Sequence, residues 1–141
     1  MDTRFRFRRA ANYFNLSTPL GLLIAVAGGA SRQPGPDGLV LAFGYRHRFP
    51  AAAAFTVGNV VLTRRNALSE QLVRHEARHA TQWAWCAGLP MVPLYLVAML
   101  ASVIVCGDQA SCNVFERLAG LDDGGYPRNA VWWRRRARRR G

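Results

Sequence analysis

The alternation of hydrophobic and polar positions predicts a mixed α and β chain. Short runs rich in β-branched and aromatic residues predict strands, and longer stretches with apolar residues at helical spacing predict helices. The predicted elements are two helices within residues 10–30, strands at about 38–43 and 55–62, and helices at about 67–87, 90–105 and 113–121. We therefore predict an α+β fold. In it, short antiparallel strands pack on the helix at 67–87, which is followed by an apolar helix and a short helix bearing a glutamate.

Glycine, proline and small polar residues place the boundaries of these elements. Residues 33–38 are dense with turn formers and predict a loop. Gly58 and Asn59 interrupt the strand predicted at 55–62, which indicates a bulge or a close approach of another backbone. Thr63 or Asn66 is expected to cap the helix that follows.

Two apolar stretches raise the question of membrane contact. Residues 80–107 contain no charged residue and no histidine, but a helix over 90–105 would be about 24 Å long, shorter than a bilayer core of about 30 Å. A buried core helix and a helix dipping into one leaflet both fit this length. Residues 16–30 follow a basic segment and imitate a secretory signal. Their proline and glycines make them a weak helical core for a signal peptide, which argues against cleavage.

The charge of the 141-residue chain is concentrated at its ends. The chain has 19 basic and 8 acidic residues, a net charge of +11, and every basic residue is arginine. The arginines of residues 1–9 and 134–140, less Asp2, carry +9 of this charge. This distribution excludes a uniformly basic nucleic-acid-binding domain. It predicts a basic arm at 1–9, one domain at 10–128 and a basic tail at 129–141.

Aromatic residues accompany the arginines at both ends. Trp132 and Trp133 precede the C-terminal run, and Phe5 and Phe7 alternate with arginines near the N-terminus. Tryptophan beside cationic residues is typical of a membrane interface. We therefore expect an anionic membrane surface as a partner, at the cytoplasmic face. Solvated tails on a soluble cytoplasmic protein and contact with nucleic acid are the alternatives, and the oligomeric state is not predicted.

The strongest chemical signal is the motif His75-Glu76-x-x-His79. Residues four apart lie on one face of a helix, so the two imidazoles can bind one zinc ion. Glu76 is turned about 100° from His75, beside the metal rather than on it, where it can take a proton from zinc-bound water. The histidines fall on the apolar stripe of the helix, where an imidazole needs a partner. Gln82, one turn further on, is a candidate partner for His79.

A catalytic zinc needs a third protein ligand. Glu70 is too close to the motif on the same helix, so Glu116 on a later helix is the main candidate. The weaker candidates are Asp108, Asp122 and His47.

The motif and its surroundings resemble gluzincin-type zinc metallopeptidases, in particular small HExxH proteins of bacteria. The resemblance covers roughly residues 38–126. It is carried by His75-Glu76-x-x-His79-x-x-Gln82-Trp83, Gly88-Leu-Pro-x-x-Pro-Leu-Tyr95, Phe115-Glu116-x-x-Ala119-Gly-Leu and the strand at 55–62. It implies that His75, His79 and Glu116 ligate zinc and that Glu76 is the general base. In zincins, a strand beside the active-site helix binds the substrate backbone.

The sequence thus predicts a membrane-associated zinc metallopeptidase with a peptide or protein substrate. Tyr126 is a candidate catalytic residue for stabilising the oxyanion, with His47 and Arg78 as alternatives. The second interpretation is a non-enzymatic protein, associated with a membrane or nucleic acid, whose zinc site is structural or vestigial.

The three cysteines form no zinc-binding pair. Cys106 and Cys112 bracket a short loop and can pair in an oxidising compartment, leaving Cys86 over. Three reduced cysteines are expected.

Overall fold

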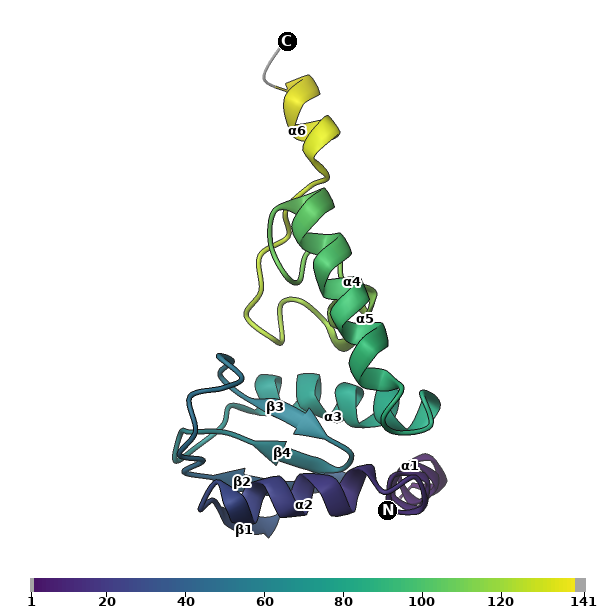
Figure 1. The fold of residues 1–141 in the computed structure, drawn as a ribbon, viewed down its shortest axis with the longest axis vertical. Coiled ribbons are helices and arrows are strands. Elements are labelled where there is room, and N and C mark those ends of the chain that lie inside the picture. Colours follow the sequence, from purple (N-terminus) through teal and green to yellow (C-terminus); the bar gives the residue numbers. More distant parts are fainter. Residues whose placement is uncertain (1, 139–141) are drawn as a thin grey trace. The chain divides into compact units, whose positions relative to one another are not determined.

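The chain has an α+β fold, as predicted (Figure 1). A computed structural model describes residues 2–138, so Arg139 and Arg140 of the predicted basic tail lie outside the described residues. The chain divides into two compact units, Met1–Met91 and Val92–Gly141.

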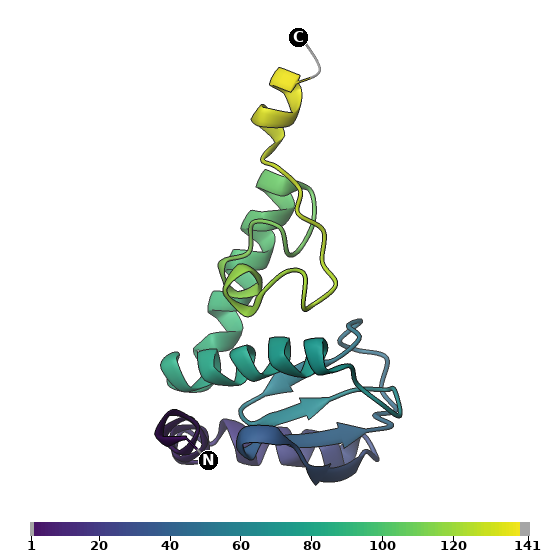
Figure 2. The same ribbon diagram turned by 180° about the vertical axis from the view of Figure 1, so that it is seen from behind.

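The first unit places a mixed sheet between two helices. The sheet order is β1 (Ser31–Pro34), β2 (Val40–Phe43), β4 (Val60–Leu62) and β3 (Phe55–Val57). Helices α2 (Ser17–Ala27) and α3 (Glu70–Trp85) cover opposite faces (Figures 1 and 2). Successive side chains of a strand point to opposite faces. Accordingly, Val60 packs against Gly21 of α2, and Val61 joins Leu72 and Ala80 of α3 in the core.

The strands differ from the prediction in three ways. The run at 55–62 is a hairpin, because Gly58 and Asn59 form a two-residue turn between β3 and β4 rather than a bulge. The pairing of β2 with β4 is parallel, so the predicted antiparallel pairing is wrong for these two strands. Gln33 and Pro34, predicted as loop, belong to the exposed strand β1, where an edge position tolerates proline.

The turn residue Gly58 cannot carry a side chain without a large loss of stability. Its φ is +63°, and an added Cβ would lie 2.4 Å from the backbone nitrogen of Thr18, which confirms the predicted close approach. We expect Gly58→Ala to lower the free energy of unfolding by about 3 kcal/mol, because overpacking adds to the left-handed strain.

Gly44 provides a matched control for this substitution in urea unfolding. Its φ is +74°, but no described atom lies within 4 Å of an added Cβ. Gly44→Ala should therefore cost only about 1 kcal/mol. Equal losses for the two variants would contradict the role of the Thr18 contact.

Residues 3–9 of the predicted basic arm form the first half of helix α1 (Thr3–Phe14), which packs on α3. Arg8 is buried and donates to the carbonyl oxygens of Asp37 at 2.6 Å and Ala77 at 3.4 Å. Burial lowers the pKa of Arg8, and the charge of Asp37 opposes this shift. Asn12, one turn further on, donates to the carbonyl oxygen of Ala80 at 2.8 Å. Residues 3–9 are therefore part of a helix that packs on the core, not a solvated tail.

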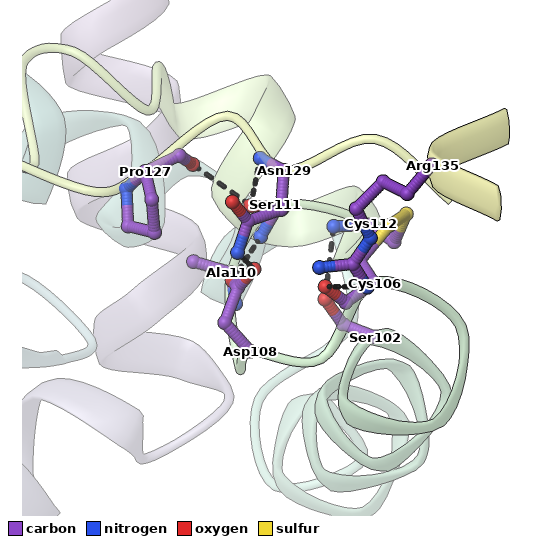
Figure 3. Close-up of a disulfide and its surroundings, with 9 residues drawn as sticks. All are labelled: Ser102, Cys106, Asp108, Ala110, Ser111, Cys112, Pro127, Asn129 and Arg135. Atoms are coloured by element: carbon purple, nitrogen blue, oxygen red, sulfur yellow. Dashed lines mark hydrogen bonds between the residues drawn. A yellow bond between two sulfur atoms is a disulfide. The ribbon is translucent and has the colours of Figure 1, made fainter. Parts of the chain in front are cut away.

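The second unit contains helices α4 (Met91–Cys106), α5 (Val114–Ala119) and α6 (Trp132–Arg138). The helices predicted at 90–105 and 113–121 are confirmed as α4 and α5. Cys106 and Cys112 form a disulfide between the end of α4 and the start of α5, so the expectation of three reduced cysteines is wrong (Figure 3).

The loop closed by this disulfide is ordered by Asp108. Its carboxylate accepts hydrogen bonds from the backbone nitrogens of Ala110 at 2.9 Å and Ser111 at 2.7 Å, and from the side chain of Asn129 at 2.8 Å (Figure 3). Partial burial acts to raise the pKa of Asp108, but these hydrogen bonds together lower it. The loop and the segment before α6 are thereby held together.

Among residues 2–138, no single helix has both the length and the apolar composition needed to cross a membrane. Helices α1 and α2 pass such a test only as a pair, bent by 73°.

Candidate metal centre

Helix α3 carries the HExxH motif. The hydroxyl of Ser69 caps it by accepting a hydrogen bond from the backbone nitrogen of Leu72 at 3.2 Å, so the predicted caps Thr63 and Asn66 are wrong. Trp83 fixes the other end by donating to the carbonyl oxygen of Thr56 on β3 at 2.8 Å. The helix is therefore tied at both ends.

The two motif histidines present their Nε2 atoms to one another. These atoms lie 3.0 Å apart, and the exposed fractions of His75 and His79 are 1% and 8%. Gln82 Oε1 lies 2.8 Å from Nδ1 of His79, as expected from the sequence. An amide oxygen only accepts hydrogen bonds, so this contact favours the tautomer with the hydrogen on Nδ1, in which Nε2 keeps its lone pair for a metal.

Glu76 lies on the part of α3 that faces the sheet. Its exposed fraction is 3%, and the Thr56 hydroxyl donates to Glu76 Oε2 at 2.6 Å. Strand β3 thereby orients the carboxylate of Glu76. Thr56 could not be identified from the sequence, because nothing in the sequence indicates which residue of a strand meets a given turn of a helix.

Glu116 is positioned within the second unit. Asn113 caps α5 by accepting a hydrogen bond from the backbone nitrogen of Phe115 at 3.0 Å, which places Glu116 in the first turn. Glu116 has an exposed fraction of 2%, and the hydroxyl of Tyr95 donates to its Oε1 at 2.5 Å. Tyr95 belongs to the motif Gly88-Leu-Pro-x-x-Pro-Leu-Tyr95, but its contact with Glu116 was not predicted.

His75, His79 and Glu116 form a cluster that can bind a metal ion. One ligand atom from each residue lies within 4.8 Å of the other two, and all three residues are buried. Two imidazoles and one carboxylate form a donor set typical of catalytic zinc, with bonds of about 2.0–2.2 Å. The chemistry of these donors therefore fits zinc.

The weaker ligand candidates lie in other surroundings. Nε2 of His47 lies 3.3 Å from the carbonyl oxygen of Ala27, and Asp108 orders the disulfide loop. Asp122 pairs with Arg128 at 2.6 Å, and this hydrogen bond lowers the pKa of Asp122. Tyr126 is half-buried, and its proposed catalytic role stays a prediction.

No family model, curated protein or solved structure matches this chain. The resemblance to gluzincins therefore depends on the quoted motifs and on the cluster of His75, His79 and Glu116.

Proposed function

We propose that this protein is a zinc-dependent hydrolase of the gluzincin type that acts on peptide bonds. The observation that carries the proposal is the buried cluster of His75, His79 and Glu116, with the carboxylate of Glu76 in the same HExxH motif. The choice of a peptide substrate follows from the resemblance of the motifs to those of metallopeptidases.

Each residue has a distinct role in this proposal. His75, His79 and Glu116 hold the metal, and Gln82 and Tyr95 orient two of these ligands. Bound zinc supplies a Lewis acid that polarises a substrate carbonyl and makes water more acidic. Glu76 takes the proton from the attacking water and returns it to the leaving amine. The hydroxyl of Thr56 holds the Glu76 carboxylate in place for this transfer.

The size of the cluster favours a catalytic over a structural zinc site. Structural zinc is almost always enclosed by four protein ligands, often cysteines, whereas catalytic zinc commonly has three. The cluster formed by the described residues has three members, none of which is a cysteine. A structural zinc site would require a fourth protein ligand from outside this set.

Metal content tests the proposal directly. We expect about one zinc per purified chain by elemental analysis, as for a site with three protein ligands. His79→Ala should lose this metal, because it removes one of the two imidazoles. His47→Ala, which changes the exposed third histidine, should retain it. The proposal would be contradicted if the wild type bound no zinc after incubation with the metal. It would also be contradicted if the two variants had equal metal contents.

A further inference from the structure

The exposed side of α4 is entirely apolar. Seven large hydrophobic side chains of this helix have exposed fractions from 42% to 69%. They are Val92, Leu94, Leu96, Val97, Leu100, Val103 and Ile104. Residues 91–106 contain no charged side chain. A surface helix of a soluble protein normally turns charged and polar residues outward, so α4 departs from that pattern.

The polar groups of α4 point toward its own unit instead. Ser102 has an exposed fraction of 0%, and its hydroxyl accepts a hydrogen bond from the backbone nitrogen of Cys112 at 2.8 Å (Figure 3). The hydroxyl of Tyr95 donates to Glu116 at 2.5 Å. With polar groups inside and apolar groups outside, α4 has the arrangement expected of a helix surrounded by hydrocarbon.

A basic cavity lies near the C-terminal end of this helix. It has a volume of about 390 Å³, and Arg117, Arg128, Arg134, Asn129 and Trp133 are among its lining residues. Arg128 is paired with Asp122, so Arg117 and Arg134 provide the additional positive charge.

Two links join this cavity to the end of α4. The disulfide connects Cys112, which lines the cavity, to Cys106, the last residue of the helix (Figure 3). Arg135, next to the lining residue Arg134, donates to the carbonyl oxygen of Cys106 at 2.9 Å (Figure 3). The apolar face therefore ends beside the arginines.

We propose that the second unit docks on an anionic phospholipid bilayer. The exposed face of α4 enters the acyl region of one leaflet, and the arginine cavity binds the phosphate of a lipid headgroup. The order of groups supports a lipid partner, because an apolar helix followed by tryptophan and arginine matches the change from hydrocarbon to headgroup. Nucleic acid would use the arginines and leave α4 exposed. The proposal is independent of zinc chemistry.

Vesicle sedimentation with the full-length chain tests this surface. The wild type should bind vesicles of mixed phosphatidylcholine and phosphatidylglycerol more tightly than vesicles of phosphatidylcholine alone. Leu96→Ser/Leu100→Ser should weaken binding about tenfold for each leucine. Arg117→Gln/Arg134→Gln should weaken binding to the anionic vesicles about fivefold for each arginine and should have little effect on neutral ones.

The first unit supplies matched controls. Leu23→Ser/Val26→Ser removes two exposed apolar side chains of α2, with exposed fractions of 65% and 56%. Arg48→Gln/Arg65→Gln removes two exposed arginines. Both control variants should bind anionic vesicles like the wild type. All substituted side chains are exposed or line an open cavity, so thermal unfolding should be unchanged in every variant.

Four results would overturn the proposal. The first is equal binding of anionic and neutral vesicles by the wild type. The second is unchanged vesicle binding when the leucines of α4 are replaced. The third is that the wild type sediments as a dimer without lipid, whereas Leu96→Ser/Leu100→Ser stays monomeric. A second copy of the chain would then cover α4. The fourth is loss of duplex DNA binding in Arg117→Gln/Arg134→Gln with vesicle binding intact, which would instead assign the cavity to nucleic acid.

Discussion

Replacing Glu76 with glutamine is expected to lower peptide hydrolysis by about 10²–10⁴-fold, the usual contribution of general acid–base catalysis. Glutamine has nearly the same shape, and its amide oxygen can still accept the hydrogen bond that the Thr56 hydroxyl donates. It cannot, however, accept a proton at neutral pH. The fold and the zinc content should therefore be unchanged, and only turnover should fall. A fluorogenic peptide library at fixed zinc concentration provides the assay.

Glu70 gives the matched control for this substitution. It lies on the same helix, its side chain is 99% exposed, and its carboxylate is 4.0 Å from Arg74. Glu70→Gln should keep both activity and metal, because this glutamate lies at the solvent-exposed start of α3. If Glu76→Gln hydrolyses peptides as fast as the wild type, Glu76 is not the base. If both glutamine variants bind zinc and the wild type has no activity on any peptide, the substrate class is wrong but the metal site remains.

The sequence predicts the helical part of this fold and centre well, because the relevant signals are local. Apolar residues at helical spacing locate α3 and α4 to within a few residues. The spacing of His75 and His79 alone places their imidazoles together, as the 3.0 Å separation of their Nε2 atoms confirms. Glu116 could be proposed because the chain contains few glutamates and the histidine pair required a third ligand.

Long-range contacts could not be predicted in the same way. The run at 55–62 has the composition of one strand interrupted at Gly58 and Asn59, and the pairing of Val57 with Val60 shows that these two residues form a turn. The pairing of β2 with β4 depends on where that turn lies. Similarly, the hydrogen bond from Tyr95 to Glu116 joins residues on different helices, and no period or motif encodes it. Arg8 falls in the predicted basic arm because nearby residues are basic, yet its side chain is buried and donates to carbonyl oxygens of Asp37 and Ala77.

Replacing Glu116 with alanine should weaken zinc binding by more than about 100-fold. Binding energies of about 10–16 kcal/mol for protein zinc sites are shared among few ligands, so losing one costs several kcal/mol. Tyr95→Phe should have a smaller effect, about 10–100-fold, because it removes a hydrogen bond that orients a ligand and leaves the ligand itself. Zinc affinity measured by competition with a chelating dye gives both values.

The order of these two effects is the informative result, because it separates a ligand from the residue that positions it. Arg117→Gln changes the neighbour of Glu116 on α5 and should leave zinc affinity unchanged, since Arg117 is exposed. If Glu116→Ala binds zinc as tightly as the wild type while His79→Ala does not, the metal is held by the histidines and a different third ligand. If Tyr95→Phe matches the wild type, Glu116 keeps its role and Tyr95 loses its own. If both variants lose zinc affinity and the loss is larger for Glu116→Ala, we conclude that helices α4 and α5 together hold the carboxylate.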